Sequence, residues 1–231
     1  PRLAAVYAPN DKDTGKLILS RSVRRANDLF LRKEQNVSPE KLNLLELRYD
    51  RQQTSSLLYG GSFFYERYDA FGEAAYLGLL ENLGKYSIGG FELETMYKSG
   101  WTTISFSHAF TKLLDADQDE VFDFTYVTAE PNGFGNDLAS WSNHSTKINA
   151  IFEASNRLTL SSSLVTFWGY PGSKDLTSYN SSRPKAQQSR FLGTYEGHDD
   201  AFGPSAYLNF GFHYETIKSL EIRGDLFNML G

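Results

Sequence analysis

A period of two in hydrophobic and polar residues recurs along the whole chain. Leu45, Leu47 and Tyr49 alternate with Glu46, Arg48 and Asp50, and the same alternation runs through residues 91–94, 208–215 and 220–226. Successive side chains of a β-strand point to opposite faces of its sheet. The alternation therefore predicts strands with one apolar and one polar face.

Applied to the full sequence, this criterion predicts about ten strands. They cover residues 3–9, 16–24, 42–52, 55–67, 86–98, 101–113, 145–155, 158–168, 205–215 and 220–228. Several reach the ~9–11 residues that a tilted strand needs to cross a bilayer, whereas soluble strands average ~5–6 residues.

The predicted connections alternate between short and long. Short turns fall at 53–54, 99–100, 156–157 and 216–219, with a slightly longer one at 10–15, and long loops at 25–41, 68–85, 114–144 and 169–204. Outer-membrane barrels have short periplasmic turns and long extracellular loops. The predicted fold is therefore all-β: an antiparallel up-and-down transmembrane β-barrel.

Composition agrees with this prediction but allows an alternative. Aromatic residues make up 15% of the chain and cysteine is absent. The mean hydropathy of −0.43 suits strands that turn every second residue to a polar lumen. The net charge of −5 provides no basic surface, which argues against nucleic-acid binding. A soluble antiparallel sheet with one wet face would show the same alternation.

Aromatic residues near the predicted strand ends are candidates for the girdles at the two membrane interfaces. They are Trp101, Phe110, Phe167, Trp168, Tyr170, Tyr207 and Tyr214.

Four segments carry a family resemblance when taken in order. Residues 16–27 end in Arg24-Arg25-Ala26-Asn27, residues 38–46 contain Pro39-Glu40 and then Glu46, and the other two are Gly89–Glu94 and Asp225–Asn228. These segments resemble motifs of TonB-dependent outer-membrane receptors: the Phe-Arg-Ala-Pro-like region, the Pro-Glu element, the Gly-Val-Glu-Leu-Glu strand and the penultimate-strand signature.

The resemblance implies a barrel of ~22 strands with a plugged lumen. On that basis residues 1–231 form one partial barrel domain, with the plug domain and the final strand absent. It also implies a location in the bacterial outer membrane, lipid and lipopolysaccharide around the wall, and contact with TonB through the missing N-terminal part. The implied activity is energy-coupled uptake of a scarce nutrient, such as a ferric siderophore or another metal chelate.

No residue pattern indicates catalysis, a resident metal or a cofactor. The four histidines, His108, His144, His198 and His213, do not follow a metal-ligand spacing. Glu92 and Glu94 share one face of a predicted strand, where lining of a polar interior is the expected role. We therefore expect no enzyme activity and no cofactor.

Binding residues concentrate on loops held by a rigid scaffold, so the long loops are the expected ligand site. Aromatic and arginine side chains suit an anionic aromatic chelate. The candidates are Tyr126, Trp141, Arg183, Arg190 and Tyr195. Haem is disfavoured, because haem receptors of the family carry a histidine in the interval that residues 28–35 occupy here. A passive porin-like barrel and a soluble carbohydrate-binding β protein remain as alternatives.

Overall fold

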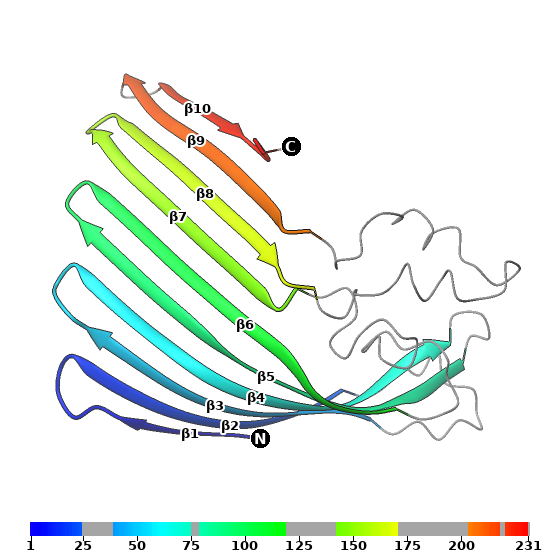
Figure 1. The fold of residues 1–231 in the computed structure, drawn as a ribbon. Coiled ribbons are helices and arrows are strands. Elements are labelled where there is room, and N and C mark those ends of the chain that lie inside the picture. The colour runs from blue at the N-terminus through cyan, green and yellow to red at the C-terminus, as the bar shows by residue number, and fades with distance from the viewer. Residues whose placement is uncertain (25–38, 75–78, 119–141, 171–202, 218–219, 231) are drawn as a thin grey trace, which may run out of the picture.

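The computed structural model describes residues 1–24, 39–74, 79–118, 142–170, 203–217 and 220–230. Its strands are β1 Arg2–Tyr7, β2 Asp13–Arg24, β3 Glu40–Gln52, β4 Leu57–Ala74, β5 Leu79–Ser99, β6 Thr102–Gln118, β7 His144–Ser155, β8 Leu158–Trp168, β9 Ser205–Ile217 and β10 Leu220–Leu226. They form one sheet in which each strand pairs antiparallel with the next along the chain (Figure 1). Among these residues, β1 and β10 each pair with a single neighbour, so the sheet is not closed.

The sheet curves like part of a barrel wall. Short turns lie at one end, on the left of Figure 1, and the longer connections leave from the other end. No helix in the described residues is long and apolar enough to cross a membrane. The all-β, up-and-down antiparallel prediction is confirmed.

All ten predicted strands are present, but two predicted loops, 68–85 and 114–144, are too long. In the first, β4 continues to Ala74 and β5 begins at Leu79, with an irregularity in pairing between Ala70 and Phe71. β6 likewise continues to Gln118. Strand segments that leave the bilayer face water on both sides and need no apolar alternation, so the sequence criterion does not detect them.

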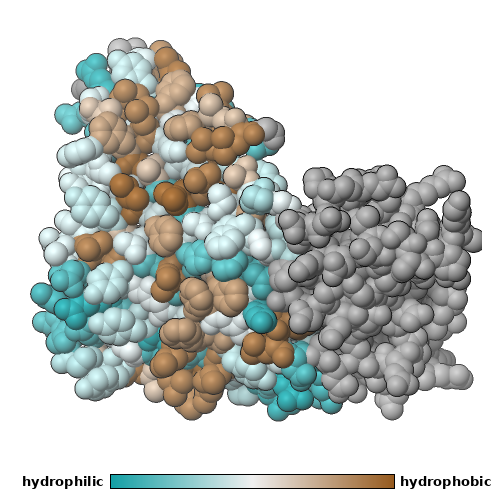
Figure 2. Space-filling model, in the orientation of Figure 1, coloured by the Kyte–Doolittle hydropathy of each residue, from teal (hydrophilic) through white to brown (hydrophobic). Residues whose placement is uncertain are grey.

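The apolar side chains lie on the outer, convex face of the sheet. Leu17, Leu47, Phe63 and Phe91 are consecutive partners across β2 to β5, and Leu47 and Phe63 are 57% and 68% exposed. Figure 2 views this face, where apolar side chains form a broad region with hydrophilic ones towards its ends. Among the described residues, Ile18 and Leu113 are the buried hydrophobic side chains.

An outward apolar face distinguishes a membrane barrel from a soluble sheet. A soluble sheet buries its apolar face against a second layer. Here the large apolar residues are partly exposed, and removing their exposed part from water is favourable by about 25 cal/mol for each Å² of apolar surface. This face therefore favours a lipid environment over a soluble protein.

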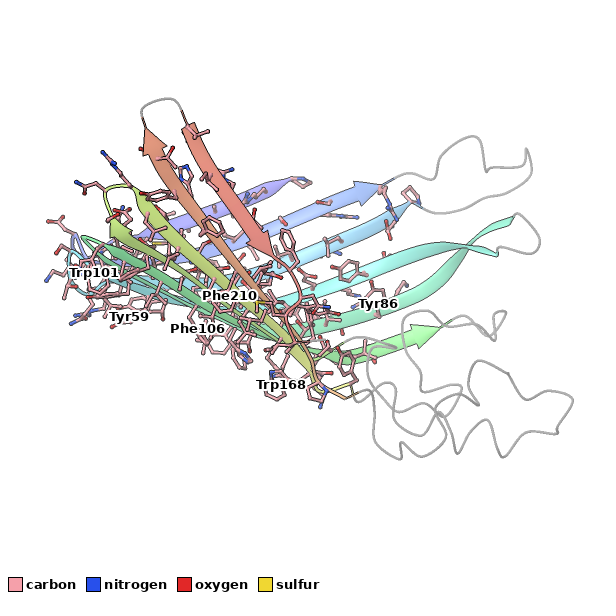
Figure 3. The ribbon with its side chains drawn as sticks, turned by 90° about the horizontal axis from the view of Figure 1, so that it is seen from above. Tyr59, Tyr86, Trp101, Phe106, Trp168 and Phe210 are labelled. Atoms are coloured by element: carbon pink, nitrogen blue, oxygen red, sulfur yellow. The ribbon has the colours of Figure 1, made fainter. Side chains whose placement is uncertain are left out.

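Aromatic side chains border the outer face at both ends. At the short-turn end are Tyr7, Tyr49, Tyr59, Tyr97 and Tyr214, all exposed. Trp101, in the turn before β6, packs edge-on against Phe152, with ring centroids 4.8 Å apart. In Figure 3, Tyr59, Trp101, Phe106 and Trp168 point away from the concave side.

Some of the residues predicted for the girdles face outward and others do not. Trp101, Phe110, Trp168 and Tyr214 lie with the outer face. Phe167 and Tyr207 instead contact each other on the inner face, with centroids 6.4 Å apart, and Tyr170 lines an inner hollow. The cause is the period of two: Phe167 and Trp168 are adjacent, so only one of them can face outward.

Candidate functional site

A network of charged side chains crosses the inner face from β2 to β5. Lys16 Nζ lies 2.9 Å from Asp50 Oδ2, and Arg48 Nη2 lies 2.8 Å from Asp50 Oδ1. The same guanidinium nitrogen pairs with Glu94, two strands away. These side chains are 20–47% exposed, so each pair contributes about 0–1 kcal/mol. The network is better described as a fixed charge arrangement than as a large source of stability.

Gly60 on β4 makes this crossing possible. It pairs with Asp50 on one side and Glu94 on the other, so it lies directly between the two carboxylates. A Cβ at Gly60 would come within 2.5 Å of Asp50 Oδ1. A glycine on the intervening strand therefore lets Arg48 reach both acids.

Beside the network is a hollow of about 250 Å³. Its polar lining includes Arg48, Asp50, Glu94, Ser105 and Ser107. Leu58 and Met96 also line it, so the hollow combines charged groups with apolar side chains.

The inner face carries an aromatic pair at its long-loop end. The Tyr68 and Tyr86 rings stack in parallel, with centroids 4.7 Å apart and planes 7° from one another. Tyr68 Oη donates a hydrogen bond to Glu66 Oε2. Arg24 forms an ion pair with Glu40, which lies on β3 two residues beyond Leu42, the partner of Tyr68. In Figure 3, Tyr86 lies on the concave side.

The Tyr68–Tyr86 pair lies beyond the apolar band of the outer face. Arg67 and Asp69, the residues on either side of Tyr68, face outward at this level, and both are charged. Burial, and then the bond to the Glu66 carboxylate, raise the pKa of Tyr68 well above its ordinary value. Burial also raises the pKa of Tyr86. Both hydroxyl groups therefore remain protonated at neutral pH, and the stack offers neutral aromatic faces beside carboxylates.

A second hollow, of about 370 Å³, opens on the inner face at the same end. It is lined by Ala109, Thr111, Ser142, Asn143, Ser145, Phe167 and Tyr170. The buried Asn143 forms its edge: its carbonyl accepts from the Thr111 amide at 2.8 Å, and its amide donates to the Gly169 carbonyl at 2.6 Å. Gly169 has a φ of 73°, a conformation that glycine adopts without steric cost, and it turns the chain out of β8 ahead of Tyr170.

The Tyr68–Tyr86 stack and the hollow beside Tyr170 both lie towards the end of the sheet that is opposite to the short turns. Tyr68, Tyr86 and Tyr170 are aromatic, and their neighbours are polar, which is the composition of a small-molecule site. The predicted ligand residues, Tyr126, Trp141, Arg183, Arg190 and Tyr195, lie outside the described residues. Their role stays a prediction.

The structure brings together histidines that appear scattered in the sequence. On the outer face, His108 Nε2 lies 3.4 Å from His144 Nδ1, and the His144 ring stacks on Trp168 at 3.6 Å. On the inner face, His213, Glu215 and Glu221 place one ligand atom each within 4.8 Å of one another. The sequence contains one indication of the second cluster: His213 and Glu215 are two residues apart on one predicted strand, and a short turn connects this strand to the strand that carries Glu221.

Sequence comparison and structure comparison give different results. No protein-family model matches the chain, and no curated protein matches it. Solved receptors match it in structure along almost its full length. The ferric-catecholate import receptor Fiu of Escherichia coli K12 has a TM-score of 0.62 at 10% identity, covering 99% of this chain and 30% of the receptor.

Two further solved receptors match the chain in structure, also at low sequence identity and over about a third of their own length. The ferric enterobactin receptor PfeA of Pseudomonas aeruginosa, solved with enterobactin, has a TM-score of 0.66 at 15% identity, covering 100% of this chain and 35% of the receptor. The FrpB iron transporter of Neisseria meningitidis has a TM-score of 0.69 at 11% identity, covering 99% and 34%.

The chain thus spans about a third of the length of the solved receptors it matches. These proteins are TonB-dependent transport receptors and not enzymes. Identities of 10–15% establish the fold alone. With its outward apolar face, polar inner face and ten consecutive antiparallel strands, the chain has the fold of part of the β-barrel wall of TonB-dependent receptors.

Proposed function

We propose that residues 1–231 are part of the barrel of an outer-membrane receptor that imports a ferric chelate, driven by TonB. The observation that carries the proposal is the sheet itself: an apolar outer face, a charged inner face and an aromatic rim at the long-loop end, matched over the whole chain by iron-import receptors. In this proposal residues 1–231 form one barrel unit of a larger protein.

We propose that the imported ligand first contacts the long loops and then the aromatic residues Tyr68 and Tyr86 on the inner face. A ferric catecholate is anionic and aromatic, and one of the matching receptors was solved in complex with enterobactin. Loop residues Tyr126, Trp141, Arg183, Arg190 and Tyr195 are proposed to make the first contact, through stacking and charge-assisted hydrogen bonds. The Tyr68–Tyr86 stack would then present aromatic faces below them.

Location is the first test, in the source bacterium. The full-length protein should fractionate with the outer membrane and migrate on gels as a heat-modifiable, detergent-solubilised barrel. Recovery in the aqueous phase after detergent partitioning would contradict a membrane protein.

Transport is the second test. Cells deleted for the gene should lose uptake of a radio-iron-loaded catecholate chelate, and a protonophore should abolish uptake in the parent strain. Tyr68→Ala combined with Tyr86→Ala should lower uptake, whereas Gly100→Ala, at a turn with open space around it, should not. Protonophore-insensitive uptake, with open conductance in planar bilayers, would instead indicate a passive porin.

A further inference from the structure

The short-turn end of the inner face, opposite to the proposed ligand entrance, carries a separate cluster. His213 and Glu215 belong to β9 and Glu221 to β10, and one ligand atom from each lies within 4.8 Å of the other two. An imidazole nitrogen and two carboxylate oxygens are a donor set for a divalent transition ion such as Zn²⁺.

The hairpin register creates the cluster. Glu221 pairs with Glu215 across the two strands, and an irregularity between Leu220 and Glu221 brings this pair next to the turn. Like charges directly opposite one another destabilise a sheet. A cation between the two carboxylates would convert this repulsion into attraction.

The histidine is placed as a ligand would be. His213 Nε2 is buried and makes no hydrogen bond, although it lies 3.2 Å from Glu221 Oε2. The distance is short enough for an ion pair, but the angle does not allow a hydrogen bond, so the Nε2 lone pair or proton is not directed at the Glu221 carboxylate and has no partner in this cluster. A metal ion bound between the two groups would satisfy both.

Two other charged groups of the hairpin, Arg223 and Asp225, lie on this face, and they carry opposite charges. Arg223 pairs with His213 across the hairpin, and within the described residues it makes no ion pair. Asp225, one row further from the turn, has a carboxylate oxygen directly over Gly211. On the β8 side, His213 faces the uncharged Thr159.

We propose that His213, Glu215 and Glu221 bind one divalent transition-metal ion, with Zn²⁺ as the reference, and that this ion clamps the β9–β10 hairpin at its turn. Three protein ligands leave a coordination position for water. The site is independent of the imported ligand, because it lies at the other end of the sheet from Tyr68, Tyr86 and Tyr170.

The test is metal binding to the full-length protein in detergent, with its nutrient ligand absent. We expect one equivalent of Zn²⁺ to bind in dialysis at about pH 7.5, and Co²⁺ to give visible absorption bands in its place. His213→Ala and Glu221→Gln should each lower the affinity at least tenfold, whereas Glu153→Gln, an exposed glutamate on β7, should leave it unchanged.

A variant that fails to fold is recognised because its migration on gels no longer changes with heating. If His213→Ala or Glu221→Gln fails in this way, Glu215→Gln replaces it as the variant that lacks one proposed ligand. Equal Zn²⁺ affinity in the parent protein and in correctly folded ligand variants would overturn the proposal, as would no binding at 100-fold excess metal. If the unaltered full-length protein bound Zn²⁺ but imported no ferric chelate, the proposed function would be contradicted and the metal site would still stand.

Discussion

Leu47 and Arg48 are adjacent in β3 and face opposite environments. Leu47 is 57% exposed on the outer face between Leu17 and Phe63, whereas Arg48 holds two carboxylates on the inner face. The contrast shows that this sheet has no core of its own on either side. Its outer face needs lipid, and its inner face needs polar partners.

The inner face is itself divided. From β2 to β5 it carries ion pairs, whereas from β6 to β9 it carries neutral hydrogen bonds, such as Asn149 to Ser105 and Asn209 to Ser163. A partner on the first half meets the ion-pair network, whereas a partner on the second half meets mainly amides and hydroxyl groups, together with the charged groups of Lys147 on β7 and Glu215 on β9.

The largest effect should come from placing a charge on the outer face. Leu47→Arg should cost about 2–4 kcal/mol if this position lies near the bilayer centre. Urea titration of the full-length protein in lipid vesicles measures the free energy of unfolding. The control is Ser161→Arg on the inner face, and equal losses for both variants would contradict the assignment of faces.

The next largest effect concerns Gly90, whose backbone is approached closely. A Cβ there would lie 1.9 Å from the Phe110 carbonyl oxygen and 2.7 Å from the Phe64 ring. Gly90→Ala should therefore lower the free energy of unfolding by about 1–3 kcal/mol, as overpacking does. Gly100→Ala is the matched control, because nothing lies within 4 Å of a Cβ at that position. A harmless Gly90→Ala would show that β5 and β6 are further apart than described.

A smaller effect is expected from removing the charge that links the inner network. Arg48→Met leaves Glu94 without this partner and leaves Asp50 with Lys16. Two partly exposed pairs are lost, so stability should fall by about 1 kcal/mol, and less at high salt. Lys98→Met, also on the inner face, serves as the control in the same titration. A loss that salt does not diminish would argue against an electrostatic origin.

The smallest loss of stability should come from removing a neutral hydrogen bond on the inner face between β6 and β9. Asn149→Ala removes one exposed hydrogen bond of 3.3 Å to Ser105 and should cost about 0.5 kcal/mol or less. The same denaturation assay measures it. A loss as large as that of Arg48→Met would remove the distinction between the two halves.

The strands and their faces could be predicted from the sequence because the bilayer imposes an apolar residue at every second position. The prediction failed where that constraint ends, at residues 68–74 and 79–85, which extend β4 and β5 beyond the band. The prediction that Phe167 and Tyr207 face outward was wrong, because the position of a residue near a strand end does not determine which face of the sheet its ring occupies.

The clusters could not be predicted, because they depend on register between strands. Arg48 reaches Glu94 only because Gly60 lies opposite Asp50, and Glu221 meets Glu215 only through the irregularity beside Leu220. The spacing of residues within one strand does not determine which residues of the neighbouring strands lie opposite them. The loop residues were chosen by composition, and their assignment rests on that reasoning alone.

Nearest-neighbour pairing has a consequence for how the wall assembles. β7 and β8 are joined by residues 156–157, whereas β8 and β9 are joined by residues 169–204. Closing the longer connection costs about 2.5 kcal/mol more in chain entropy. Strands joined by short connections should therefore pair first and join the others afterwards, so that the kinetic units of assembly are β3 to β6, which are linked by connections of two to four residues, and hairpins such as β7–β8.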